Sequence, residues 1–402
     1  MKQFVVSQVV LLLVAVCCGW SWYPAANLRP RIPRFNDQPR VVRPEYNYPF
    51  VVSDDQLQQV LVKIKPRFLT VPTKVNFVDH GIRLWGSKIK FYDDSLDGPE
   101  MLNLLLDDSQ FRNMWGKQAP ALLHKTDFGI SVLTQQGRST VSHVDHMTGT
   151  LAEIGIPLSH PVVTRSGQGQ VADLLRHTIL SFQLNQKEYE WTALAAAFYT
   201  ADAEPWYSNE GQRIDFNLLA ERIMRQRQPL GVCYGQHRLY TLVMLLRINE
   251  QMQVESGKRL LDPTAEQSVK DYLLGMTRRF HQTQALDGYW DGNWPDKKKA
   301  VPDPGTDELS RRILATGHVL EWWAMAPEEL HPPRATIVRS AQWLSRVIIE
   351  MDDRTIEKNY TFLTHAARCL ALWRSKFAYE VPLNTQVEND IPNTTEVALK
   401  SH

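Results

Sequence analysis

Three histidines stand at similar places in three strongly apolar segments of the chain. They occur in Gly235-Gln236-His237, Thr316-Gly317-His318 and Leu363-Thr364-His365. An imidazole titrates near neutral pH, so it can accept a proton, donate one or bind a metal ion. Glu321 lies about one helical turn beyond His318, and Tyr240 lies three residues after His237. These residue types predict acid–base catalysis by His237, His318, Glu321 and Tyr240.

The same neighbourhood suggests a binding site. His365 and Arg238 are expected to contact a ligand, and the N-termini of helices favour an anionic one. The alternative is structural: each histidine hydrogen-bonds a loop carbonyl and packs in the core. Convergence of the three histidines depends wholly on the fold, because gaps of 81 and 47 residues fit no metal motif.

A second group of histidines lies in His143-Val144-Asp145-His146. If this stretch is helical, His143 and His146 share a face at i, i+3 and could hold a metal ion. No third ligand is evident, although His160 is near in sequence, and helix-start polar residues are commonly caps. Cys233 and Cys369 form no CxxC pair. A disulfide between them is possible in an oxidising compartment, but free buried thiols are the first expectation. No metal ligand set is therefore assigned, and no cofactor is indicated.

Aromatic residues suggest a ligand platform. Trp290 and Trp294 alternate with Asp287 and Asp291, an arrangement that could bind a saccharide between two carboxylates. Trp322, next to Glu321, is a further ligand-binding candidate. The alternative is that these rings serve as loop architecture and core filling.

One motif points to a fold. Residues 280–290 read FHQTQALDGYW, an aromatic-x3-Gln-x3-Gly-x-Trp pattern. It resembles the QW motif of the squalene-cyclase and prenyltransferase group of α/α toroids. The resemblance implies that Gln284 caps a helix end, that Gly288 permits a tight turn and that Trp290 helps to tie helix pairs together. The chain has no DxDD sequence, which is the proton donor of squalene-type cyclases, and no prenyltransferase-type zinc ligand set.

Apolar periodicity predicts the helices that must position these residues. Segments that are apolar nearly all round, which must be enclosed, alternate with one-faced amphipathic segments. The predicted fold class is all-α: an α/α toroid, complete or incomplete, with a small mixed α+β N-terminal part. The expected helices of the toroid are 170–184, 188–200, 215–224, 235–251, 265–280, 316–325, 336–350 and 361–373.

The chain divides into five expected parts. Residues 1–22 have the short basic start and apolar centre of a signal peptide, or a membrane anchor. Residues 23–50 form a Pro/Arg-rich linker, and residues 51–165 a mixed part with helices near 54–64, 76–85 and 99–105. A hairpin is expected around Gln135-Gln136, followed by a helix capped by Thr140 or Ser142. Residues 166–380 hold the toroid helices and residues 381–402 a loose tail.

Composition limits the function. The 402 residues carry a net charge of +1, which gives no global reason to expect nucleic acid. Membrane contact is expected only through the N-terminal segment, which predicts a secreted or cell-envelope protein. No catalytic motif is intact, so a binding or scaffold role around a central cavity is the first expectation, with a glycan or hydrophobic small molecule as ligand. The alternative is a lyase or hydrolase acting on a glycan or lipid-like substrate, and the third is a terpenoid cyclase-like enzyme. Whether the chain is an enzyme stays open.

Overall fold

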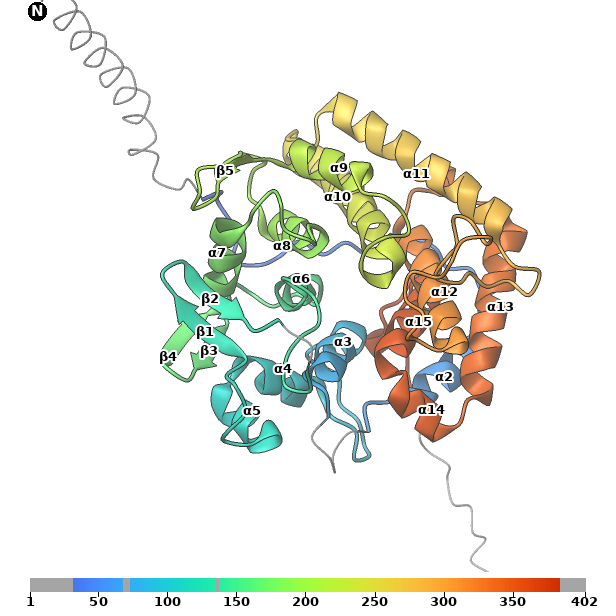
Figure 1. The fold of residues 1–402 in the computed structure, drawn as a ribbon, viewed down its shortest axis with the longest axis horizontal. Helices are drawn as coiled ribbons and strands as arrows, with labels where there is room; N and C mark the ends of the chain where they lie inside the picture. Colours follow the sequence, from blue (N-terminus) through green and yellow to red (C-terminus); the bar gives the residue numbers. More distant parts are fainter. Residues whose placement is uncertain (1–31, 68–72, 135–136, 384–402) are drawn as a thin grey trace, which may run out of the picture.

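The protein is mainly helical, as the sequence predicted. The computed structural model describes residues 32–67, 73–134 and 137–383. Strands in this part form only two-stranded antiparallel hairpins: β1–β2, β3–β4 and β5–β6. Their bounds are Leu123–Thr126, Gly129–Val132, Pro161–Thr164, Gly167–Gln170, Trp206–Tyr207 and Arg213–Ile214. The fold class is therefore all-α with small β elements (Figure 1).

Six helices are buried over most of their surface. They are α3 (Val75–Trp85), α6 (His146–Glu153), α8 (Glu190–Tyr199), α10 (Gln236–Ser256), α12 (Glu308–Met325) and α15 (Tyr360–Leu372). Along this series each helix packs against the next, and α15 packs back against α3. Every residue of α8 is buried. A helix without a solvent face must be surrounded by other elements, which these neighbours supply.

Other helices lie outside this closed cycle. They are α2 (Asp54–Lys63), α4 (Gly98–Leu106), α5 (Asp108–Trp115), α7 (Val171–Ser181), α9 (Phe216–Arg225), α11 (Pro263–Thr283), α13 (Arg334–Glu350) and α14 (Asp353–Lys358). In α9 the buried residues Phe216, Leu219, Ala220 and Ile223 follow the i, i+3, i+4, i+7 pattern of a one-faced helix. Figure 1 shows α11 and α13 along the outside of α10 and α12.

The QW-like residues join two outer helices. The Gln284 side chain, just after the end of α11, donates to the Thr336 carbonyl at 2.9 Å and to Ser340 Oγ at 2.7 Å, both on α13. Gly288 has φ +106°, and a Cβ there would lie 2.5 Å from the Arg339 carbonyl oxygen. The buried Trp290 donates its indole N–H to the Phe280 carbonyl at 3.0 Å. This loop therefore acts as architecture, tying α11 to α13.

Several local predictions were wrong. The first hairpin turns at Asp127-Phe128, not around residues 135–136, which lie outside the described residues. The N-cap of α6 is Asp145 in a left-handed conformation, so neither Thr140 nor Ser142 caps it, and His143 lies before the helix. Helices α12 and α15 begin at Glu308 and Tyr360, which places His318 and His365 in mid-helix. Polar residues at the start of α12 concealed its first two turns from a search for apolar runs.

The Pro/Arg-rich segment is not a solvated spacer where the structure describes it. Its backbone N–H groups at Asn36 and Arg40 donate to carbonyls at the end of α8, and Tyr48 N–H donates to the Trp373 carbonyl. Its Val42 and Tyr46 side chains are buried. Docking satisfies backbone groups that proline prevents from forming regular structure. Helices α3 and α6, which lie before residue 165, pack in the same cycle as α8, α10, α12 and α15.

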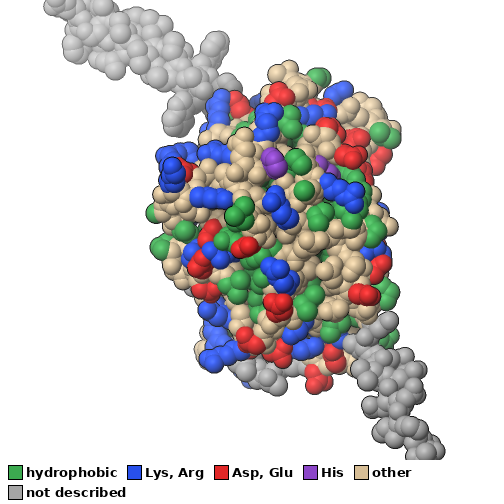
Figure 2. Space-filling view, turned by 90° about the vertical axis from the view of Figure 1, so that its right-hand side faces the viewer, with side chains coloured by type: hydrophobic (Ala, Val, Ile, Leu, Met, Phe, Trp, Pro, Cys, Tyr) green, Lys and Arg blue, Asp and Glu red, His purple; other side chains and the backbone are tan. Residues whose placement is uncertain are grey.

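The described surface carries mixed charge. In Figure 2 basic and acidic side chains are interspersed on the face shown. No helix of the described residues is both long enough and apolar enough to cross a membrane. The predicted signal peptide or anchor, residues 1–22, and the tail from residue 384 lie outside the described residues.

Candidate functional site

Six histidines meet where the buried helices face one another. The neighbouring ring centroids lie 3.9 Å apart for His318 and His365, 4.7 Å for His237 and His318, and 4.4 Å for His80 and His146. His143 completes the group, with its ring 5.1 Å from that of His237. All six side chains are at least nine-tenths buried. Together they form the histidine cluster: His80, His143, His146, His237, His318 and His365.

Most of these imidazoles use one nitrogen and leave the other without a partner. His80 Nδ1 lies 2.9 Å from the Asn76 carbonyl, His146 Nδ1 lies 2.5 Å from Asp79 Oδ2, and His318 Nδ1 lies 3.1 Å from Glu321 Oε2. A carbonyl or carboxylate oxygen accepts, so His80 and His318 donate from Nδ1 and present a lone pair at Nε2. Nε2 is buried without a hydrogen-bond partner among the described residues in His80, His146, His237, His318 and His365.

Two carboxylates and two guanidinium groups frame the cluster. Arg83 and Arg368 each pair with Glu153 and with Glu321, at N···O distances from 2.5 to 3.2 Å. Tyr240 donates its hydroxyl to Glu153 and accepts from Arg368 Nη2 at 2.9 Å. The two positive and two negative charges balance, so their mutual attraction offsets the desolvation cost of burying them. The frame fixes Glu321, which in turn orients His318 and His365.

Burial and charge set the protonation states. Burial lowers the pKa of His80, His146, His237 and His365 well below the usual range, and neighbouring imidazoles add to the effect. Burial alone would raise the pKa of Glu321, but Arg83 and Arg368 hold it well below normal. At neutral pH these four imidazoles are therefore uncharged and Glu321 is ionised.

A pocket of about 890 Å³ reaches one side of the cluster. His143 and Cys233 are among its lining residues, whereas His237, His318 and His365 are not. Phe77, Tyr234 and Phe362 supply aromatic surface. The lining also includes four cationic side chains and a single carboxylate: Lys74, Arg138, Lys187 and Lys358 with Asp303. An opening of this character suits a polar, negatively charged ligand.

The structure brings together the predicted catalytic residues. His237, His318 and His365 converge, and Glu321 contacts two of them. Tyr240 is close by but engaged with Glu153 and Arg368, and burial raises the pKa of its hydroxyl. Arg238 lies apart from the pocket lining, in a buried ion pair with Glu190 at 3.0 Å.

The predicted aromatic platform does not line this pocket. Trp290, Trp294 and Trp322 are at most 1% exposed and pack around Phe280 in the core. Trp290 and Trp294 donate their indole N–H groups to the carbonyls of Phe280 and Tyr234. Aromatic core packing, the alternative considered from the sequence, describes their position.

Sequence reasoning missed several members of the site. His80, Asp79 and Arg83 lie on α3, where charged residues inside a helix that must be buried were an available signal. Cys233 and His237 are four residues apart, a spacing that was overlooked. Among the described residues, three groups have ligand atoms within 4.8 Å of one another and could hold a metal ion: His143 with Cys233 and His237, His237 with His318 and His365, and Asp79 with His80 and His146. His160 belongs to none of them.

Comparison with known proteins yields no relative. No protein-family model, no curated protein and no solved structure matches this chain.

Proposed function

We propose that this protein is an enzyme, a lyase or a hydrolase, that binds an anionic glycan in the pocket and transforms it at the histidine cluster. One observation carries the proposal: a pocket large enough for a sugar unit ends on His143, behind which lie imidazoles with unpartnered Nε2 atoms. Such atoms lose the free energy of a hydrogen bond unless a ligand, water or proton-transfer partner meets them. His143 lines the pocket, so its imidazole is the group of the cluster placed to accept a proton from a bound substrate.

The pocket favours a substrate class. Lys74, Arg138 and Lys187 can pair with carboxylate or sulfate groups, while the aromatic side chains can pack against sugar rings. A cationic lining suits an anionic glycan better than an uncharged isoprenoid, so a terpenoid cyclase that acts on an uncharged substrate has less support.

Two further parts of the proposal concern shape and location. The closed cycle from α3 to α15 is consistent with the inner ring of an α/α toroid, with the outer helices as its second layer. Export from the cytoplasm rests on the sequence of residues 1–22 alone.

The test is a substrate panel on the full chain. Uronate-containing and sulfated glycans are compared with neutral glycans and prenyl diphosphates, and products are detected by mass spectrometry. We expect turnover of an anionic glycan, reduced by about 10²–10⁴-fold in His143→Gln. Lys187→Gln should raise KM, while Lys299→Gln, on an exposed loop outside the pocket lining, should match the wild type.

Two outcomes would contradict the proposal. If His143→Gln turns over the substrate as fast as the wild type, the reaction does not take place at His143 in this pocket. Binding of an anionic glycan without any chemical change would leave a binding protein instead.

A further inference from the structure

We propose that His143, Cys233 and His237 form a metal site at the floor of the pocket, with Zn²⁺ as the preferred ion. The inference rests on the proposed function for its purpose, although metal binding itself can be measured without a substrate. One sulfur and two imidazoles are a ligand set that zinc accepts, normally in tetrahedral geometry.

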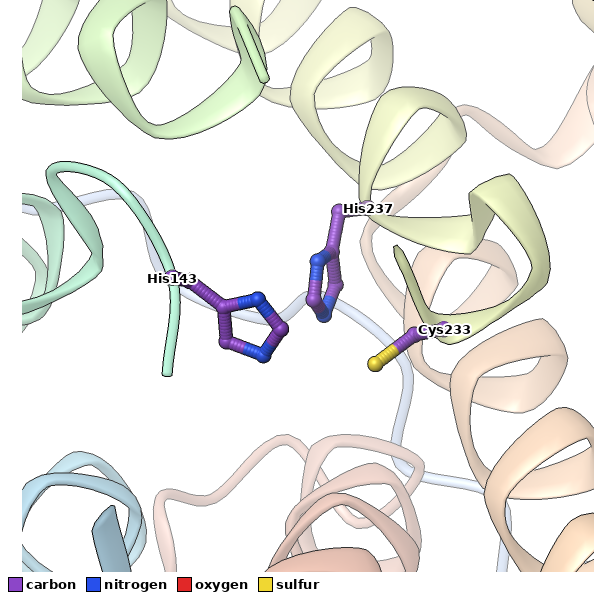
Figure 3. Close-up of side chains that lie close together, drawn as sticks. All are labelled: His143, Cys233 and His237. Atoms are coloured by element: carbon purple, nitrogen blue, oxygen red, sulfur yellow. The ribbon is translucent and has the colours of Figure 1, made fainter. Parts of the chain in front are cut away.

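The three side chains converge from separate segments. His143 lies in the loop before α6, Cys233 in the 3-10 helix η1 (Val232–Gly235), and His237 in the first turn of α10. Their potential ligand atoms all lie within 4.8 Å of one another. Figure 3 shows the Cys233 sulfur and both imidazole rings directed toward a common space.

The backbone holds Cys233 in this position by an unusual path. Cys233 and Tyr234 have φ values of 48° and 57°, a left-handed conformation that non-glycine residues rarely adopt. Their neighbours Gly231 and Gly235 also have positive φ. The Tyr234 carbonyl is fixed by the Trp294 indole N–H at 3.2 Å. Strained residues of this kind persist where the surroundings determine them, and they gather at functional sites.

Ligand atoms are available on both histidines. His237 Nε2 is buried without a hydrogen-bond partner among the described residues. Glu188 Oε1 lies 3.5 Å from His143 Nδ1, and its other oxygen accepts from Val144 N–H at 3.2 Å. Glu188 is placed to accept the Nδ1 proton of His143, which leaves Nε2 of His143 with the lone pair that binds the ion, the arrangement in which carboxylates orient metal-binding histidines.

The pocket distinguishes this group from the other two. His143 and Cys233 line the pocket, so a fourth coordination position would face the space proposed for the substrate. The group of His237, His318 and His365 and the group of Asp79, His80 and His146 lie behind it and are fully enclosed. An open position is the mark of a catalytic zinc, where it activates a bound water.

Binding requires one proton to leave. The Cys233 thiol is converted to a thiolate that bonds to the ion, and the proton passes to the solvent through the pocket. Both histidines bind through neutral nitrogens. No electron is transferred, so no redox partner is needed.

The first experiment uses the full chain after removal of metal by a chelator. Titration with Zn²⁺ against a competing chelator should give one equivalent bound with Kd below about 1 μM. Titration with Co²⁺ should produce a sulfur-to-cobalt charge-transfer band. Failure of the wild-type protein to bind either ion would overturn the proposal.

Matched cysteine variants locate the site. Cys233→Ser should weaken Zn²⁺ binding by at least about 100-fold and abolish the charge-transfer band. Cys369→Ser, which removes a buried thiol outside the group, should leave both unchanged. Equal binding by Cys233→Ser and the wild type would place the ion elsewhere, for example on the histidine-only group, and would overturn this assignment. Because no substrate is present, these results are independent of whether a glycan is turned over.

Discussion

Two regions of this protein contain buried polar groups but differ in how completely those groups are hydrogen-bonded. In the loop after α11, Gln284 makes hydrogen bonds to α13, and the indole N–H groups of Trp290 and Trp294 both reach carbonyls. In the histidine cluster, five Nε2 atoms have no partner among the described residues. The first region satisfies its polar groups within the protein, whereas the second leaves nitrogen lone pairs available to a ligand. This difference is what the proposed functional site depends on.

The largest stability effect should come from the frame of the cluster. Glu321→Gln leaves Arg83 and Arg368 with only Glu153 to balance two buried cations. We expect a loss of about 3–5 kcal/mol in the free energy of unfolding, measured by denaturant titration. Glu308→Gln breaks an exposed pair with Arg312 on the same helix and should change stability by no more than about 0.5 kcal/mol. Equal effects of the two variants would mean that the buried frame is not stabilising.

The loop after α11 should be sensitive to backbone geometry but irrelevant to metal binding. Gly288→Ala places a Cβ against the Arg339 carbonyl at a φ of +106° and should cost about 1–3 kcal/mol. Gly275→Ala, on α11 with no atom within 4 Å of the new Cβ, should instead gain about 0.5–1 kcal/mol. Thermal unfolding checks stability, and Zn²⁺ titration should be the same for both variants. A loss of Zn²⁺ affinity in Gly288→Ala would couple the two regions and break the comparison.

Two buried tryptophans allow the contribution of one indole N–H hydrogen bond to stability to be measured. Trp290 and Trp322 are both at most 1% exposed, but only Trp290 has a hydrogen-bond partner for Nε1 among the described residues. Replacement of each by phenylalanine removes a similar volume. Trp290→Phe should therefore lose more stability than Trp322→Phe by about 0.5–1.5 kcal/mol, as denaturant titrations would show. A larger loss for Trp322→Phe would contradict the expectation.

The sequence predicted the part of the site that lies on the long apolar helices. His237, His318 and His365 each lie in an apolar segment that must be enclosed, and the side-by-side packing of α10, α12 and α15 brings the rings together. His80 and His146 were not grouped with them, because their helices are short and were assigned to a separate N-terminal part. The approach of Cys233 to His237 depends on left-handed backbone at Cys233 and Tyr234. Only glycine commonly adopts a left-handed backbone, so the residue types at Cys233 and Tyr234 do not predict it. The approach of Cys233 to His237 could therefore be seen only in the structure.

The smallest change in stability should come from a residue at the centre of the cluster. His237→Leu removes an Nε2 atom that is buried without a hydrogen-bond partner and replaces it with apolar volume. In metal-free protein we expect the free energy of unfolding to stay the same or to rise by up to about 1 kcal/mol, because an unmet desolvation penalty disappears. With Zn²⁺ present the order should reverse, since only the wild type would gain stability from the bound ion. Denaturant titrations with and without Zn²⁺ give both values. A loss above about 2 kcal/mol in the metal-free protein would show that His237 is a core residue whose packing, rather than a ligand, explains its place.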